Sequence, residues 1–194
     1  MQQSRYATKA GPSSEPPPAG THKAVLVRFI ELGMQPGYQG AADEDSVYLT
    51  FELPNAKKAN GEPFLVGRYY SIKWGAKANW TKVQSALLGR TPEPGEVVTP
   101  DDLIGQGCQI VIVHSKRDDG TVLGKIESLI PMAQGDEAPM PATNPVFFDF
   151  EKKMQVVYDS LPEFLRKSID AGKPYPEAAN DTAAEPDFDD DIPM

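Results

Sequence analysis

The chain has 194 residues, of which 40% are hydrophobic, and a formal net charge of −9. This length allows one domain with a core rather than two, and the single cysteine, Cys108, excludes an internal disulfide. No apolar run approaches the ~20 residues that span a bilayer, and the N-terminus has no secretory hydrophobic region. We therefore expect a protein of the reducing cytoplasm that does not associate with membranes.

The charge is unevenly distributed along the chain. From Glu177 to the C-terminus there are seven acidic residues and no basic one, so residues 1–176 carry a net charge of only −2. Between residues 57 and 90 the balance reverses, with Glu62 the only acid. The basic residues there are Lys57, Lys58, Arg68, Lys73, Lys77, Lys82 and Arg90. We expect the basic patch on the fold and the acidic tail outside it to have separate roles.

The N-terminal third of the chain predicts an arm followed by two strands. Residues 1–20 contain SSEPPPAG without apolar periodicity, which is typical of a disordered arm. A β-rich segment at 22–32 and a polar, glycine-bearing loop at 33–45 follow. SVYLTFEL (46–53) alternates apolar residues on one face with Ser46, Tyr48, Thr50 and Glu52 on the other, which predicts a half-buried strand.

The middle of the chain predicts a third strand, a helix and a hairpin. Asn60-Gly61 indicates a turn before a strand at 64–74. Residues 76–88 place Ala76, Trp80, Val83 and Leu87 on one helical stripe, which predicts a core position for Trp80, and Gly89 would end the helix. Strands at 108–115 and 121–130 are joined by an Asp118-Asp119-Gly120 turn.

This order of elements is typical of a mainly β, five-stranded OB-fold barrel with a helix between its third and fourth strands. We expect the barrel to span residues 21–131. Residues 132–170 would form an extension packed on the barrel, with short helices before and after Pro162. Residues 171–194 are rich in Pro, Ala and acid, which predicts a disordered tail.

An OB barrel binds oligonucleotides on the outward face of its second and third strands, where single strands need rings for stacking and cations for phosphates. Tyr69 and Lys73 share the outward face of the third strand, whereas Val66, Tyr70 and Ile72 fall on its core side. The expected DNA-binding residues are Tyr48, Thr50, Arg68, Tyr69, Lys73, Trp74, Lys57, Lys58, Lys77, Lys116 and Arg117. Rings in strands also commonly serve packing, and cations at hairpin tips serve solubility, so both interpretations stay open for each residue.

The last eight residues are Asp187-Phe188-Asp189-Asp190-Asp191-Ile192-Pro193-Met194. This tip resembles the C-terminal tip of bacterial single-stranded DNA-binding proteins, D-F-D-D-D-I-P-F, at seven of eight positions. The resemblance implies that Asp189, Asp190 and Asp191 supply charge while the last three residues enter an apolar pocket on replication, recombination or repair proteins. Met194 stands where the family has Phe, and a thioether can fill an aromatic slot.

Residues 22–170 resemble a single-stranded DNA-binding family of tailed phages and prophages, through their loops and the NPVFFDF and LPEFLRKSI segments. The resemblance implies an accessory protein of phage-type replication or recombination in a bacterial host cytoplasm. From the charges, we also expect the free tail to compete with DNA for the basic patch.

We find no motif for catalysis, a cofactor or a metal. The sequence has no Gly-rich phosphate loop, no cysteine–histidine metal spacing and no serine elbow, and His22 and His114 are far apart. Four alternatives stay open: an OB-fold protein–protein adaptor without a DNA role, a nuclease using Asp118 and Asp119, binding of double-stranded DNA through phosphates alone, and self-association.

Overall fold

The computed structural model describes residues 15–75 and 77–176, which form a mainly β structure with a few short helices. The strands are β1 (Gly20–Gln35), β2 (Glu44–Lys57), β3 (Pro63–Ser71), β4 (Gly107–Lys116), β5 (Val122–Ile130) and β6 (Val146–Phe148). The helices are α1 (Asn79–Leu88), α2 (Pro100–Leu103), α3 (Gln155–Ser160) and α4 (Glu163–Ala171), with a 3-10 turn η1 (Tyr38–Gly40). None of the helices in this part of the chain has the length and apolar character needed to cross a membrane.

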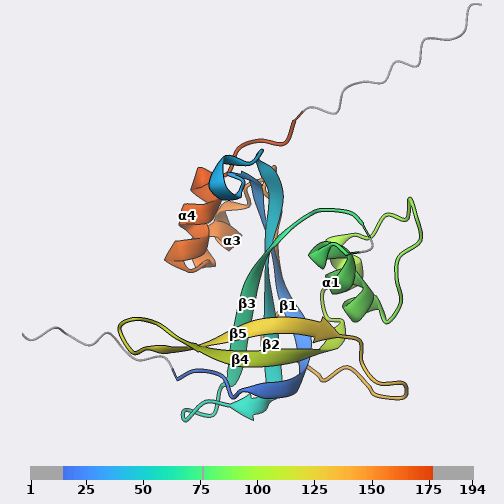
Figure 1. Ribbon diagram of the computed structural model, residues 1–194, viewed down its shortest axis with the longest axis vertical. Helices are drawn as coiled ribbons and strands as arrows, with labels where there is room; N and C mark the ends of the chain where they lie inside the picture. The colour runs from blue at the N-terminus through green and yellow to red at the C-terminus, as the bar shows by residue number, and fades with distance from the viewer. Residues whose placement is uncertain (1–14, 76, 177–194) are drawn as a thin grey trace, which may run out of the picture.

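The six strands form one sheet. Five of them pair antiparallel in the order β3-β2-β1-β4-β5, and β6 pairs parallel with β1. Strand β1 changes partner along its length, pairing with β4 through residues 20–25 and with β2 from Val25 onward. Its register shifts between Leu26 and Arg28, and such irregularities bend a strand. The β4–β5 hairpin consequently lies across β1, β2 and β3 in Figure 1.

The buried residues confirm the strand and the helix that the periodicity of the sequence predicts. Val47, Leu49, Phe51 and Leu53 of β2 are fully buried in the main core, as their alternation predicts. Trp80 of α1 is also in this core, with its ring edge-on to that of Phe29 of β1. Helix α1 ends at Gly89, which has a φ of 69°. That left-handed conformation costs glycine little, and glycine is the usual residue at this position.

A second apolar cluster lies against the other face of β1. Ile30 and Leu32 pack with buried residues from the C-terminal part of the chain, namely Phe148, Phe150, Leu161, Leu165 and Ile169. Figure 1 shows α3 and α4 on one side of the long strands and α1 on the other. Strand β1 is therefore buried on both faces. Strand β6 was not expected from the sequence.

The loop expected at 33–45 is shorter in the structure, because β1 and β2 continue their ladder through Met34–Asp45 and Gln35–Glu44. Some residues assigned to disordered ends also make defined contacts. Met34 and Lys173 exchange two backbone hydrogen bonds of 2.9 and 3.0 Å, and the imidazole of His114 donates to the Pro17 carbonyl at 2.8 Å. Residues 1–14 and the tail from 177 to 194 lie outside the described residues.

Glu52 of β2 is a buried acid, with a side chain 0% exposed. Its two carboxylate oxygens accept hydrogen bonds from the backbone N–H groups of Ala142 and Thr143, at 2.7 and 2.8 Å. Burial raises the pKa of Glu52, but a hydrogen bond from the Thr143 side chain, the two backbone hydrogen bonds and the charge of Lys57 outweigh it and hold the pKa below its ordinary value of 4.5. The ionised carboxylate therefore fixes the segment after β5 onto the sheet.

Replacing Glu52 with Ala should lower the free energy of unfolding by about 1–3 kcal/mol, because two backbone N–H groups lose their acceptor in a buried site. Since the folded pKa is depressed, this stabilisation is present above pH 4.5 and is lost as the pH falls through the folded value. Urea unfolding at neutral and acidic pH measures both effects. The exposed Glu137→Ala serves as control, and a loss that stayed constant down to low pH would contradict this role for the charge.

Candidate nucleic-acid interface

The second face of β2 is mostly covered, and this corrects one expectation. Tyr48 and Thr50 do lie on the face opposite the main core, but Thr50 is only 6% exposed. The Tyr48 ring packs against Phe164 of α4 and against Tyr69, at centroid distances of 5.5 and 4.7 Å. Burial raises the pKa of Tyr48 to about 12. The residues after β5 thus occupy the face that was expected to be open, and Thr50 is not available to a ligand.

Gly67 of β3 allows this packing. Tyr48 and Tyr69 are cross-strand partners, and Thr50 lies opposite Gly67. A Cβ atom at Gly67 would lie only 2.2 Å from the Tyr48 hydroxyl oxygen. Tyr69 remains 49% exposed, although its hydroxyl lies 3.2 Å from that of Ser168 in α4. Of the two tyrosines, Tyr69 is the one with a ring available for stacking.

Arg68 connects the two end strands of the sheet. Its Nη1 atom donates to the carbonyl oxygens of Ile126 and Glu127 in β5, at 2.8 and 3.3 Å. The guanidinium also lies over the Tyr70 ring, 5.4 Å from its centroid, an arrangement typical of a cation–π contact. Strands β3 and β5 are the first and last strands in the order β3-β2-β1-β4-β5. The Arg68 side chain therefore links two strands that are not neighbours in the sheet.

Three adjoining hollows follow β3 past this connection. The first lies between β3 and β5, the second continues from Arg68 to α1, and the third reaches Lys77 beyond the end of β3. The first two share Arg68, and the last two share Tyr70 and Asn79. We call these three hollows together the β3 groove. Its charged and aromatic residues are Arg68, Tyr69, Tyr70, Lys73, Lys77, Lys82, Lys125 and Glu127.

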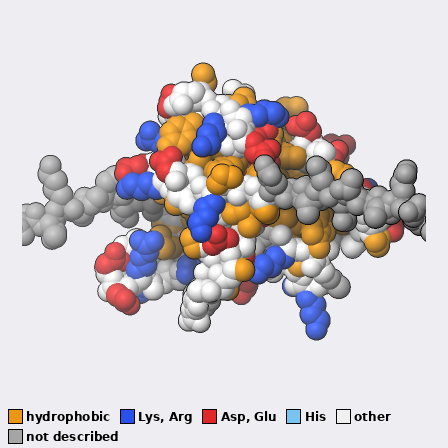
Figure 2. Space-filling model, turned by 90° about the horizontal axis from the view of Figure 1, so that it is seen from above, with side chains coloured by type: hydrophobic (Ala, Val, Ile, Leu, Met, Phe, Trp, Pro, Cys, Tyr) orange, Lys and Arg blue, Asp and Glu red, His pale blue; other side chains and the backbone are white. Residues whose placement is uncertain are grey.

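The lysines of the β3 groove are mostly free of carboxylate partners. Lys73 pairs with Glu44. Within residues 15–75 and 77–176, Lys77, Lys82 and Lys125 form no ion pair. Outside the groove, five lysines are paired (Lys23, Lys58, Lys152, Lys167 and Lys173) and three are not (Lys57, Lys116 and Lys153). A different part of the surface, the end of the molecule at the top of Figure 1, instead carries charges of both signs interspersed (Figure 2). Unneutralised cations gathered along one groove favour a polyanionic ligand.

The structure brings together only part of the expected site. Arg68, Tyr69, Lys73 and Lys77 line the β3 groove, and Trp74, 62% exposed, follows Lys73 directly. Four other expected residues do not line it. Lys57 and Lys58 lie at the end of β2, where Lys58 pairs with Glu62, and Lys116 and Arg117 lie at the β4–β5 turn. The tip, Asp187–Met194, falls outside the described residues.

Two groove residues were missed by the sequence-based site prediction. Lys82 belongs to the basic run at 57–90 and projects from α1, so the charge pattern could have indicated it. Lys125 is in β5, in a segment without a basic run, and only the approach of β5 to β3 places it in the groove. Nothing in the local sequence indicates that Lys125 belongs to this site.

Asp118 and Asp119 lie in the β4–β5 turn. Hydrogen bonds from Thr121, including one of 2.8 Å from its backbone N–H, lower the pKa of Asp119, which is the usual role of Asp in a turn. Within the described part of the chain, no group of three or more His, Cys, Asp or Glu side chains is arranged to hold a metal ion.

The chain matches no model in a scan of known protein families, and a search of curated proteins gives no match either. Its function has to be inferred from the residues of the β3 groove and of the tail.

The contact between Tyr48 and Gly67 can be tested by a double-mutant cycle. Gly67→Ala should lower the free energy of unfolding by about 1–3 kcal/mol, because the new methyl group displaces the Tyr48 ring from its packing. In a Tyr48→Ala background the same change should cost much less, since the obstructing ring is gone. Urea unfolding of the four proteins gives the coupling energy. Strictly additive costs would show that Tyr48 does not require the glycine.

Proposed function

We propose that this chain is an OB-fold protein that binds single-stranded DNA in the β3 groove and recruits replication, recombination or repair proteins through its acidic C-terminal tip. The strand order, the helix between the third and fourth strands and the side-chain connection between β3 and β5 support the OB-fold assignment. In such a protein the DNA would be held by phosphate and stacking contacts, without a catalytic step.

The observation that carries the proposal is the combination of cations without ion pairs along the β3 groove and exposed rings in and beside it. Lys77, Lys82 and Lys125 offer ammonium groups that form no ion pair with a described carboxylate, and Glu127 is the acid that lines the same hollows. Tyr69 and Trp74 are the exposed rings at the end of this row. Cations bind phosphates of any nucleic acid, but rings can stack only on bases that are not paired. The combination therefore favours a single strand over a duplex.

A protein–protein adaptor is the main alternative. A groove that binds a partner protein would be expected to be largely apolar at its centre, with charged residues depleted there. The centre of the β3 groove instead contains Asn79 and Lys82. A polyanion fits these side chains better.

Replacing Lys77, Lys82 and Lys125 together with Ala should weaken binding of oligo-dT about tenfold or more at low salt, because phosphate contacts are lost. The slope of log affinity against log salt should also fall by roughly 2, since each contact to a single strand contributes about 0.7. Fluorescence anisotropy at several salt concentrations measures both quantities.

The matched control replaces Lys23, Lys152 and Lys167, which are paired with carboxylates elsewhere. It changes the net charge by the same amount. If the two triple variants lost affinity equally, long-range charge and not the β3 groove would account for binding.

The acidic tail adds a proposed self-competition. The basic run at 57–90 has six more basic than acidic residues, and the tail from Glu177 has seven acidic ones, so the tail can occupy the groove when DNA is absent. Deleting residues 187–194 should therefore raise affinity for oligo-dT at low salt, and the gain should shrink as salt screens the charges. The same titration checks this, and unchanged affinity would refute self-competition.

A further inference from the structure

A separate hollow adjoins the end of the β3 groove. Trp74 and Gly75 form one wall, the loop at 91–96 forms the other with Pro92 and Pro94, and Thr81 of α1 contributes from the helix. We call it the Trp74 pocket. Its volume of about 560 Å³ lies within the range of small-molecule sites. Lys73 and Lys77, which line the groove, flank Trp74 in the sequence, so the two sites are built from the same stretch of chain.

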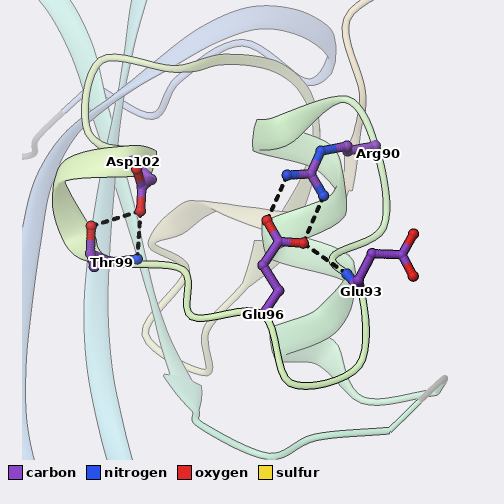
Figure 3. A network of polar contacts seen from close by, with 5 residues as sticks. All are labelled: Arg90, Glu93, Glu96, Thr99 and Asp102. Carbon is purple, nitrogen blue, oxygen red and sulfur yellow. Dashed lines mark hydrogen bonds and ion pairs between the residues drawn. The ribbon is translucent and has the colours of Figure 1, made fainter.

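The proline wall of the Trp74 pocket is held in place by a polar network, drawn in Figure 3. Arg90 and Glu96 form two parallel hydrogen bonds of 2.8 and 2.6 Å, and the same carboxylate accepts from the Glu93 N–H at 2.8 Å. Bidentate guanidinium–carboxylate pairs combine strength with a fixed geometry. The pair lowers the pKa of Glu96 to about 2, so Glu96 stays ionised at neutral pH. We call its bonds to Arg90 and to the Glu93 N–H the brace.

The chemistry of the pocket indicates a flat, neutral ligand. The Trp74 ring is 62% exposed, which is a large apolar surface to leave in water. Among the described residues, none that lines the pocket is basic, so the pocket offers no cation for a phosphate.

We infer that the Trp74 pocket receives one unpaired base of the strand whose phosphates lie along Lys73 and Lys77. The base stacks on the Trp74 indole opposite Pro92 and Pro94. This inference rests on the proposed function, because it requires a single strand in the β3 groove. It adds a base-binding position outside the face of β2 and β3, with a wall built by the loop after α1.

The test compares two oligomers of equal length, oligo-dT and an abasic phosphodiester that lacks bases. Trp74→Ala should weaken oligo-dT binding about five-fold or more, the lower end of what stacking one base contributes, and leave abasic binding unchanged. Trp74→Phe should retain most of the affinity, since a smaller ring still stacks. Circular dichroism checks that the exposed substitution leaves the fold intact.

Two glutamates give a matched pair for the brace. Glu96→Ala removes the carboxylate that holds the proline wall, whereas Glu93→Ala removes an equal charge from the same loop but leaves the brace, because only the backbone of Glu93 takes part. Loss of negative charge alone would strengthen binding of both oligomers. We expect Glu93→Ala to bind oligo-dT as well as wild type or better, and Glu96→Ala to bind it more weakly.

The outcomes separate the two levels of the proposal. If wild type binds both oligomers but Trp74→Ala binds oligo-dT normally, or loses affinity for both equally, the base pocket is wrong and the groove stands. Equal or tighter oligo-dT binding by Glu96→Ala would also overturn the pocket. If wild type binds neither oligomer, the proposed function itself fails.

Discussion

The hydrogen bonds from Arg68 to the β5 backbone determine how the β3 groove is built. They join strands that are the two ends of the sheet path, at 2.8 Å to Ile126 and 3.3 Å to Glu127. Hydrogen bonds from a charged donor contribute more than neutral ones, and the guanidinium is held over Tyr70 at the same time. Because β3 and β5 meet there, Lys125 of β5 and Lys82 of α1 come to line one groove with residues of β3.

The C-terminal segment accounts for the position of this groove. On an OB barrel the outward face of the second and third strands is the usual binding face. Here Phe164 covers Tyr48, and the carboxylate of Glu52 holds residues 142 and 143 over the same face. The exposed rings, Tyr69 and Trp74, lie where β3 leaves this cover. Under the proposed function, the strand is shifted from the middle of the sheet face to its edge and to the loops around α1.

Much of the fold could be predicted from the sequence because its cause is local. Alternation in β2, the helical stripe containing Trp80 and the glycine that ends α1 all depend on neighbours within a few residues. The covering of Thr50 could not be predicted, because the groups that cover its face lie about 90 residues away in the chain, as the bonds of Glu52 to residues 142 and 143 show. The same reason applies to Lys125, which enters the site only through the meeting of β3 and β5. The basic run at 57–90 contains Lys77 and Lys82, but it also contains Lys58, which is paired with Glu62 away from the groove.

Titration of the full chain with oligo-dT in dilute buffer, followed by intrinsic fluorescence, tests the central claim most directly. Trp74 and Tyr69 are exposed, whereas Trp80 is buried, so stacking should quench part of the emission to a saturable limit. Added salt should reverse the quenching, and a duplex of equal length should quench less. Unchanged emission together with no binding at low salt would contradict the account.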